Sequence, residues 1–258
     1  MSIVQNGSVF TIEPITATYN KLPQGNYLLS FNDRSGRYEL HKKEDFTLPS
    51  KIYGDMSIVQ RWLHSWKHNS TKNMGILLSG MKGSGKTITA QKFCIDSNLP
   101  VIIVSDAFGG GHERAFINFL SDPDLGECIV FIDEFEKVFD SHNEQSTLLS
   151  LMDGNFYTRL IFLLTVNDNH INDFLINRLN RIKYRKSYED LTYEEIDEVI
   201  DDCLDNKEHR ASIHEFFDKI NIRTLDLVIN LIKEMNLFKE DADRKSTRLN
   251  SSHGYIFV

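Results

Sequence analysis

Cysteine is scarce in this chain of 258 residues, and long apolar runs are missing from it. The three cysteines, Cys94, Cys128 and Cys203, lie far apart and among apolar residues, a pattern that favours reduced thiols in a cytosolic protein. No stretch approaches the run of about 18 apolar residues that a membrane-spanning helix needs. The opening stretch MSIVQNGSVF lacks the basic segment followed by an apolar segment that marks a signal peptide. We therefore expect a cytoplasmic protein that has no membrane partner.

Positively charged residues are also fewer than negatively charged ones. The chain has 29 lysines and arginines and 37 aspartates and glutamates, which gives a net charge of −8. A surface of that sign repels the phosphate backbone, which disfavours a non-specific nucleic-acid binder. One small basic cluster remains between Arg178 and Lys186. His64 and His68 are one helical turn apart, but Ser65 stands where a zinc protease motif needs its glutamate, so we expect no metal site at this pair.

Residues 1–50 are rich in β-branched and aromatic side chains, in the stretches GSVFTIE, NYLLSF and GRYELHK. The second and third stretches are separated by NDRSG, which predicts a β-hairpin. A region of this size is marginal for a hydrophobic core of its own. We therefore expect this small β-rich N-terminal region to pack against the rest of the chain or against a neighbour.

The segment LPSKIYGD, residues 48–55, is predicted to be a linker that ends in a helix N-cap, Asp55. The pentapeptide MSIVQ occurs at residues 1–5 and again at residues 56–60, with different flanks each time. We interpret that repeat as a coincidence. The apolar residues after the linker share the spacing of one helix face: Val59, Trp62, Leu63 and Trp66.

From residue 74 onward, short apolar runs alternate with helical segments: MGILLS, VIIVS, CIVFID and LIFLLTV. Such continuous runs are typical of strands buried on both faces, as in a parallel sheet with crossover helices. After residue 187 the runs stop and three amphipathic helices follow, the first with a capping box formed by Thr192 and Glu195. We expect an α/β domain over residues 51–187 and a small all-helical domain over residues 188–242.

The last residues, 243–258, contain the stretch DRKSTRLNSSH, which resembles the in-frame translation of a common short-read sequencing adapter. We therefore expect a non-native tail here and a natural sequence that is interrupted near Ala242. The alternative is a genuine polar C-terminal tail.

The clearest motif follows the apolar strand predicted at residues 74–79. It fits the pattern G-x-x-x-x-G-K-S/T and precedes a predicted helix, which is the context that a phosphate-binding loop requires. Glycines let backbone N–H groups curl around an anion, and the helix N-terminus adds a favourable dipole. Lys86 is predicted to reach the β- and γ-phosphates, and Thr87 to hold Mg²⁺. The residues of the loop are Gly80, Met81, Lys82, Gly83, Ser84, Gly85, Lys86 and Thr87.

The stretch CIVFIDE, residues 128–134, supplies the second half of the predicted site. Its strand delivers Asp133 and Glu134 to the carboxyl end of the sheet, where open α/β sheets bind ligands. Asp133 can coordinate Mg²⁺, and Glu134 can orient and deprotonate an attacking water. Together with the loop, this pair predicts hydrolysis of a nucleoside triphosphate. A small-molecule kinase would pass the phosphate to its substrate and has no need of a glutamate base at this position.

Residues 52–236 resemble an AAA+ ATPase in the order and spacing of these motifs, with GMKGSGKT as the Walker A loop and CIVFIDE as the Walker B strand. The stretch STLLSLMDG resembles the helix before the family's fourth strand. The resemblance implies a five-stranded parallel sheet with flanking helices, followed by a helical lid. It also implies ATP and Mg²⁺ as cofactors and, in most members, assembly as a hexameric ring.

The same resemblance assigns roles to four more residues. LIFLLTVN is similar to the sensor-1 strand, in which Asn167 positions the water. NRLNR looks like the arginine-finger segment, so Arg178 and Arg181 are expected to touch the γ-phosphate held by the adjacent subunit. That segment lacks the usual Pro-Gly, which leaves open which of the two is the finger. Arg223 resembles the sensor-2 arginine of the lid. The alternative for Arg178 and Arg181 is a basic, solvated edge strand. The alternative for Arg223 is a charge on the surface of a helix.

The loop AFGGGHER contains Phe108 and Gly109 where protein-threading members carry an aromatic residue and a glycine that line the central pore. An exposed aromatic side chain on a glycine-rich loop can grip an extended chain; the alternative is a phenylalanine folded back onto the sheet. The favoured function is therefore ATP-driven remodelling or threading of a protein by a homo-oligomeric ring. A DNA-associated loader or initiator is the alternative, and a nucleotide-binding switch without turnover is the second alternative.

Overall fold

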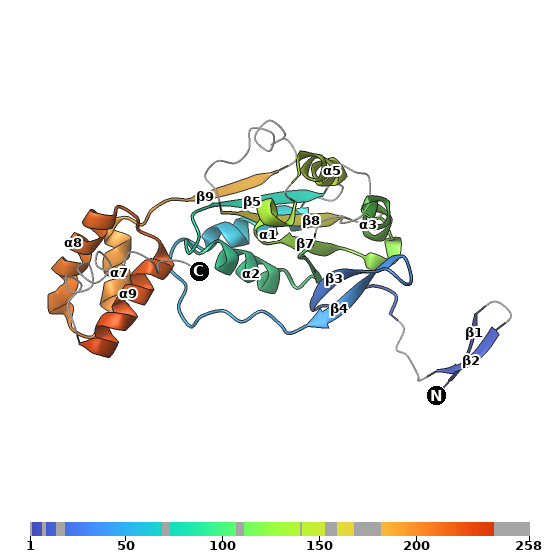
Figure 1. Cartoon of the computed structure of the whole chain (residues 1–258), viewed down its shortest axis with the longest axis horizontal. Coiled ribbons are helices and arrows are strands. Elements are labelled where there is room, and N and C mark those ends of the chain that lie inside the picture. Colours follow the sequence, from blue (N-terminus) through green and yellow to red (C-terminus); the bar gives the residue numbers. More distant parts are fainter. Residues whose placement is uncertain are drawn as a thin grey trace.

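The computed structural model describes residues 2–6, 9–13, 19–68, 73–106, 111–139, 141–152, 159–167 and 182–239. One sheet organises most of these residues, and its seven strands lie in the order β4-β3-β6-β7-β8-β5-β9 (Figure 1). The strands are β3 (Asn26–Asn32), β4 (Arg37–Lys43), β5 (Met74–Gly80), β6 (Val101–Val104), β7 (Cys128–Ile132), β8 (Leu160–Val166) and β9 (Tyr184–Tyr188).

Five of these strands, β6, β7, β8, β5 and β9, pair in parallel and form the sheet that the family resemblance implies. The expected number of five strands is nonetheless wrong for the whole sheet, because the N-terminal region contributes two more. The predicted hairpin around NDRSG is confirmed: β4 pairs with β3 in antiparallel fashion, and β3 pairs with β6 in parallel. Leu29 of β3 is buried in the core on one face of the sheet, so a hairpin too small for its own core shares that of the larger unit.

Helices cover both faces of this sheet, as the apolar strands predict (Figure 1). Trp62 and Phe93 are fully buried on one face, and Phe116 and Phe135 on the other. Because every residue of β5, β7 and β8 is buried, these three strands form the centre of the core. The helices are α1 (Ser57–His68) and α2 (Lys86–Ser97) on the first face, and α3 (Glu113–Leu120), α4 (Phe135–Val138) and α5 (His142–Met152) on the second, with a 3-10 turn (Pro123–Leu125) before β7.

Three helices after β9 pack around an apolar core of their own, to one side of the sheet (Figure 1), and we call them the lid. The predicted capping box at its start is confirmed, because the side chain and backbone of Thr192 and Glu195 exchange hydrogen bonds. Ile196 and Phe217 are fully buried between the helices. The elements of the lid are α7 (Tyr193–Cys203), a 3-10 turn (Lys207–His209), α8 (Arg210–Ile220) and α9 (Leu225–Phe238).

At the N-terminus, β1 (Ser2–Asn6) and β2 (Val9–Glu13) pair as a two-stranded antiparallel sheet, distinct from the seven-stranded one. None of the helices in the described ranges is long and apolar enough to pass through a lipid bilayer. The tail predicted at residues 243–258 lies outside the described residues.

Candidate active site

The phosphate-binding motif forms the turn between β5 and α2, and its three glycines all have a positive φ, which other residues rarely adopt. At two of them a neighbouring element also lies close to the backbone. Gly80 has a φ of +145°, and a Cβ on it would lie 2.5 Å from the carbonyl oxygen of Tyr188 on β9. Gly83 has a φ of +81°, and a Cβ on it would lie 2.9 Å from the Cβ of Asp226 on α9. The motif therefore needs glycine at both positions, for the turn and for the close approach of neighbouring elements.

Lys86 is the first residue of α2, and only 5% of it is exposed. Its Nζ donates hydrogen bonds to the carbonyl oxygens of Gly80, at 2.8 Å, and Met81, at 2.7 Å. Burial lowers the pKa of the Lys86 ammonium, and the carboxylates of Asp133 and Glu136 are among the groups that oppose this shift. A positive charge thus lies inside the loop, where the N-terminal dipole of α2 also favours a phosphate.

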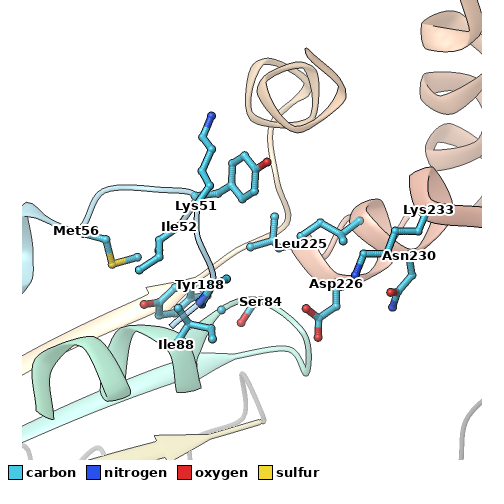
Figure 2. A pocket seen from close by; sticks show the side chains of 14 residues that line it. Lys51, Ile52, Met56, Ser84, Ile88, Tyr188, Leu225, Asp226, Asn230 and Lys233 are labelled. Carbon is cyan, nitrogen blue, oxygen red and sulfur yellow. The ribbon is translucent and has the colours of Figure 1, made fainter. Parts of the chain in front are cut away.

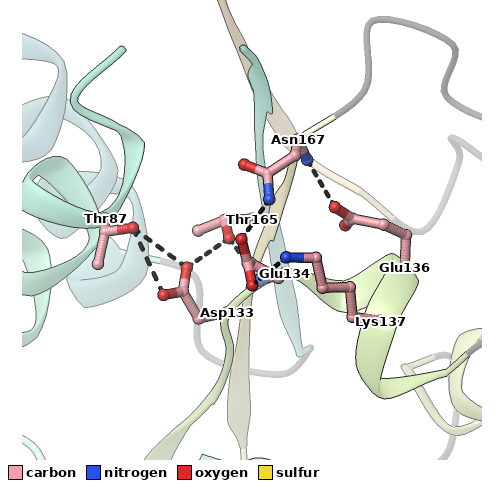
Figure 3. Close-up of polar contacts among 7 residues, drawn as sticks. All are labelled: Thr87, Asp133, Glu134, Glu136, Lys137, Thr165 and Asn167. Atoms are coloured by element: carbon pink, nitrogen blue, oxygen red, sulfur yellow. Dashed lines mark hydrogen bonds and ion pairs between the residues drawn. The ribbon is translucent and has the colours of Figure 1, made fainter. Parts of the chain in front are cut away.

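Oxygen atoms from three segments converge beside this loop, as Figure 3 shows. The Thr87 hydroxyl donates to the Asp133 carboxylate, with distances of 3.2 Å to Oδ1 and 3.4 Å to Oδ2. Thr165 on β8 donates from Oγ1 to Asp133 Oδ1 at 2.5 Å. Carboxylate and hydroxyl oxygens are hard ligands of the kind that bind Mg²⁺, so Thr87 and Asp133 fit the predicted metal. Ser84 Oγ in the loop is buried without a hydrogen-bond partner among the described residues, and a phosphate oxygen would satisfy it.

Glu134 has a φ of 51° and a ψ of 54°, a left-handed conformation that is uncommon for a non-glycine residue. Its backbone N–H donates to Thr165 Oγ1 at 2.8 Å, which holds the turn. Its carboxylate accepts a hydrogen bond from Asn167 Nδ2 at 2.5 Å and pairs with Lys137 Nζ at 2.8 Å (Figure 3). The hydrogen bond from Lys137, and after it the one from Asn167, lowers the pKa of the Glu134 carboxyl although partial burial opposes the shift. An ionised carboxylate therefore lies between the ends of β7 and β8.

Asn167, the predicted sensor-1 residue, directly follows the last residue of β8. Its backbone N–H donates to Glu136 Oε1 at 2.9 Å while its side-chain amide reaches Glu134. The structure thus brings Glu134 and Asn167 together and adds Thr165, Glu136 and Lys137, which sequence reasoning missed. Of these three, only Thr165 had a signal in the sequence, since it is a polar residue within the apolar run LIFLLTV.

A cavity of about 400 Å³ lies between the phosphate-binding loop, the linker before α1 and the lid (Figure 2). Its size is that of a pocket for a small molecule. Because it reaches Ser84 and Gly85 of the loop, a nucleoside whose phosphates occupy the loop would fit into it. Sequence reasoning missed this pocket, since its walls come from distant segments that share no spacing. The lining residues include Ile52, Tyr53 and Met56 of the linker, Ile88 of α2, Tyr188 of β9, and Leu225, Asp226, Asn230 and Lys233 of α9.

Arg223, the predicted sensor-2 residue, packs within the lid. Its guanidinium lies 5.3 Å from the centre of the Tyr193 ring, and its Nε is buried without a hydrogen-bond partner among the described residues. Asp226 of the lid does contact the phosphate-binding loop, because its backbone N–H donates to the carbonyl oxygen of Gly83 at 3.0 Å. A role for Arg223 at the nucleotide stays a prediction.

Four other predicted site residues lie in two segments, 107–110 and 168–181, that are outside the described residues. Their assigned roles, as pore-lining residues and as arginine fingers, therefore rest on the sequence and stay predictions. These residues are Phe108, Gly109, Arg178 and Arg181.

The sheet order, the lid and the site together define a P-loop nucleotide-binding protein. The family model described as "ATPase family associated with various cellular activities (AAA)" matches residues 76–187, from β5 into β9. Residues 76–187 therefore contain an AAA domain, as the motifs predict.

The proteins that are similar to this chain include two relatives and one solved structure. A protein of Pyropia yezoensis, described as the uncharacterized AAA domain-containing protein ycf46, is 24% identical over 250 residues, which cover 85% of this chain and 49% of the relative. The replication factor C large subunit of Thermoplasma volcanium is 26% identical over 117 residues, which cover 42% of this chain and 27% of the relative. The chain thus matches about half the length of the first relative and about a quarter of the second. The structure of RuvB from Thermotoga maritima has a TM-score of 0.52 at 18% identity, over 74% of this chain and 67% of that one, and supports the fold alone.

Proposed function

We propose that this chain is a Mg²⁺-dependent ATPase and that Glu134 is its catalytic base. The observation that carries the proposal is the contact between the carboxylate of Glu134 and the amide of Asn167, beside the metal-binding oxygens of Asp133. A switch that only binds nucleotide needs a phosphate-binding loop and a metal site. It has no use for a carboxylate and an amide that converge where an attacking water would lie.

Each residue of the site has a task in this proposal. Lys86 and the backbone N–H groups of the loop hold the β- and γ-phosphates. Thr87 and Asp133 hold Mg²⁺, which neutralises charge on the phosphate oxygens when it is bound. Glu134, which is ionised at neutral pH like an ordinary glutamate, accepts the proton of the attacking water. Asn167 fixes the position of that water.

Phosphate release by the purified chain tests this proposal. We expect ATP turnover in the presence of Mg²⁺ and none after chelation of the metal with EDTA. In parallel, the binding of a fluorescent ATP analogue is measured. Tight binding without any turnover would contradict the ATPase proposal and support the nucleotide-binding switch.

For the work that hydrolysis drives, we propose remodelling or threading of a protein by a homo-oligomeric ring, with a hexamer favoured. Support comes from Arg178 and Arg181, which are predicted to act on a neighbour's nucleotide, and from Phe108 and Gly109, which are predicted to line a pore. Mass photometry with a non-hydrolysed ATP analogue tests for the ring. Phe108→Ala should retain ATP binding and lose stimulation of turnover by an unfolded protein. A lower melting temperature in that variant would instead identify Phe108 as a core residue and contradict threading.

A cytoplasmic location is part of the same proposal. Cys94 and Cys128 are free and buried, and burial raises the pKa of both thiols, to about 12 in Cys128. A protonated, inaccessible thiol reacts poorly, so these cysteines are suited to remain reduced. Titration of the unfolded chain with a thiol reagent should detect all three cysteines in the free form. A disulfide detected in protein freshly isolated under non-oxidising conditions would contradict this proposal.

A DNA-associated ATPase is the second candidate function, and the surface of α1 favours it. This helix contains no acidic residue, and the exposed side chains on it include Arg61, His64, Lys67 and His68. Lys183 before β9 donates from Nζ to the hydroxyl of Ser65 at 2.7 Å, which brings one more ammonium to this surface. In a chain with a net charge of −8, such a surface is complementary to a phosphate backbone. One relative of the chain is, in addition, a replication factor.

Fluorescence anisotropy with a short labelled DNA duplex tests this candidate. The double variant Arg61→Ala, Lys67→Ala should bind DNA more weakly and should lower the slope of log K against log salt by about 2. The matched control is Lys42→Ala, Lys43→Ala, which removes the same charge from exposed positions on β4, at the opposite edge of the sheet. Equal losses in both double variants would indicate a general charge effect, and absence of binding by the wild type would contradict the candidate.

A further inference from the structure

Asn167 is held at two points, by two carboxylates that lie two residues apart in the segment after β7. Its side-chain Nδ2 donates to Glu134 Oε1 at 2.5 Å, and its backbone N–H donates to Glu136 Oε1 at 2.9 Å (Figure 3). The first bond fixes where the amide side chain ends, and the second fixes the backbone from which it starts. The orientation of the amide beside Glu134 therefore depends on both bonds.

The sheet alone does not fix the backbone of Asn167. The pairing of β8 with β7 ends at Leu164, and its pairing with β5 ends at Val166. The N–H of Asn167 comes after the last of these pairs and needs another acceptor, which the carboxylate of Glu136 supplies. Glu136 therefore takes over from the ladder at the residue where the predicted site begins.

The short helix α4 gives Glu136 a defined place. Phe135 precedes it and Phe139 follows the helix; both are fully buried in the core on one face of the sheet, with ring centres 5.4 Å apart. On the other side, the turn at Glu134 is held by the hydroxyl of Thr165. The segment that carries Glu136 is thus anchored at both ends, so its carboxylate can set the position of a neighbour.

The second oxygen of Glu136 argues against a role in stability alone. Oε2 is buried and has no hydrogen-bond partner among the described residues. A buried carboxylate oxygen without a donor costs free energy of folding. The hydrogen bond that the structure describes for this side chain is the one to Asn167. A carboxylate is therefore kept at a cost where it holds the predicted sensor-1 residue.

We propose that Glu136 is a positioning residue for ATP hydrolysis, which acts through the backbone of Asn167 and orients the amide that holds the attacking water beside Glu134. The inference rests on the proposed function, in which Glu134 is the base and Asn167 fixes that water. Without the bond to Glu136 the end of β8 can shift, and a displacement of about 1 Å in a catalytic group can lower a rate by about 10²-fold. Nucleotide binding depends instead on the phosphate-binding loop and should be spared.

Steady-state kinetics of three variants test the proposal. Glu136→Gln keeps the length of the side chain and one acceptor oxygen, so kcat should stay within about 5-fold of the wild type. Glu136→Met keeps the length without an acceptor, so kcat should fall by about 10- to 100-fold while KM for ATP changes little. Glu136→Asp keeps the charge but is too short by one methylene group, and its kcat should fall as well, which decides the matter should Glu136→Met not fold. Equal losses in Glu136→Gln and Glu136→Met, or a loss that appears in KM alone, would overturn the inference.

Glu195→Met is the matched control. The carboxylate of Glu195 also accepts a backbone N–H at 2.9 Å, from Thr192, but it does so at the start of the lid. This variant should lower the melting temperature and leave kcat unchanged. A fall in kcat as large as that of Glu136→Met would show that lost stability alone slows turnover, and it would overturn the positioning role.

A measurement without turnover separates this inference from the ATPase proposal. The side-chain amide signals of Asn167 are recorded by ¹H–¹⁵N NMR in the wild type, Glu136→Gln and Glu136→Met. They should move in Glu136→Met and stay near their wild-type positions in Glu136→Gln, because only methionine releases the backbone of Asn167. An absence of turnover in the wild type would reject the ATPase proposal, whereas unmoved signals in Glu136→Met would overturn the positioning role whether or not ATP is hydrolysed.

Discussion

The backbone N–H of Asp226 donates a hydrogen bond to the carbonyl oxygen of Gly83, with an N–O distance of 3.0 Å. Asp226 lies in the first turn of α9, and Gly83 lies in the phosphate-binding loop. A side chain on Gly83 would approach the Cβ of Asp226 to 2.9 Å. The lid therefore contacts the loop directly, so we expect a substitution that alters the loop at Gly83 to displace α9.

Gly83→Ala should weaken the binding of ATP and lower the melting temperature. Alanine at a φ of +81° costs about 1–2 kcal/mol, and its methyl group pushes against Asp226. For a chain of this size, each kcal/mol lost from the free energy of unfolding lowers the melting temperature by about 2–4 °C. Thermal melts and titration with a fluorescent ATP analogue measure the two effects.

The control for this variant is Gly36→Ala, in the turn between β3 and β4. Gly36 also has a positive φ, +67°, but a Cβ on it would have nothing within 4 Å. Gly36→Ala should therefore share the loss in melting temperature and leave ATP affinity unchanged. Unchanged affinity in Gly83→Ala would show that the contact between loop and lid has no part in nucleotide binding.

Lys86→Ala and Glu134→Gln should separate the binding of ATP from its hydrolysis. Lys86→Ala removes the ammonium inside the loop and should abolish nucleotide binding. Glu134→Gln keeps the size of the side chain and its contact with Asn167, so ATP should still bind, while turnover falls by about 10²- to 10⁴-fold with the loss of the base. Binding assays beside phosphate release check both outcomes. Full activity of Glu134→Gln would remove Glu134 from the mechanism.

The arrangement of the residues around the phosphate-binding loop was predictable, because it depends on residues that lie close together in the sequence. One octapeptide places Lys86 and Thr87 at the start of a helix, and one apolar strand ends in Asp133 and Glu134. The contacts of Thr165 were not predictable in this way, because they depend on β8 lying beside β7. The cavity beside the loop depends likewise on how the linker, β9 and the lid meet.

The repeated pentapeptide MSIVQ shows that the surrounding residues decide whether a short segment forms a strand or a helix. Residues 2–5 belong to strand β1, which pairs with β2, whereas the same four residues at 57–60 begin helix α1. In the helix, the carboxylate of Asp55 accepts the N–H of Ser57 at 2.8 Å, and Val59 is buried on the apolar face. The propensity of so short a segment is a weak preference, and its flanks override it. The hairpin of β3 and β4 was predictable, but its addition to the main sheet was not, because that depends on β3 lying beside β6, which is distant in the sequence.

Thr165→Val should impair both folding stability and turnover. The hydroxyl of Thr165 donates to Asp133 and accepts the N–H of Glu134, and only 1% of the residue is exposed. Valine keeps the shape and leaves these two half-buried groups without that partner, at a cost of about 1 kcal/mol. Thr165→Ser retains the hydroxyl and should keep most of the activity. Chemical denaturation and phosphate release measure the two variants, and identical behaviour of both would mean that the hydroxyl is unimportant.

Arg178→Ala and Arg181→Ala should spare the binding of ATP and slow its hydrolysis. Both arginines are predicted to act on the nucleotide of a neighbouring subunit, so neither belongs to the pocket of its own chain. An arginine supplied in this way contributes about 10³- to 10⁵-fold to other phosphoryl-transfer reactions, because it neutralises charge that develops in the transition state. The variant with the larger loss in turnover identifies the finger.

Mixed assemblies decide whether the arginines act between subunits. Subunits with Lys86→Ala cannot bind ATP but still offer their arginines, whereas subunits with Arg178→Ala and Arg181→Ala bind ATP and offer none. Mixed together, they should regain part of the turnover that each lacks alone. A partner that carries all three substitutions is the control, and it should restore nothing. If native mass spectrometry proves that mixed oligomers form and turnover stays absent, the arginines serve their own subunit, and hydrolysis does not depend on contact between neighbours.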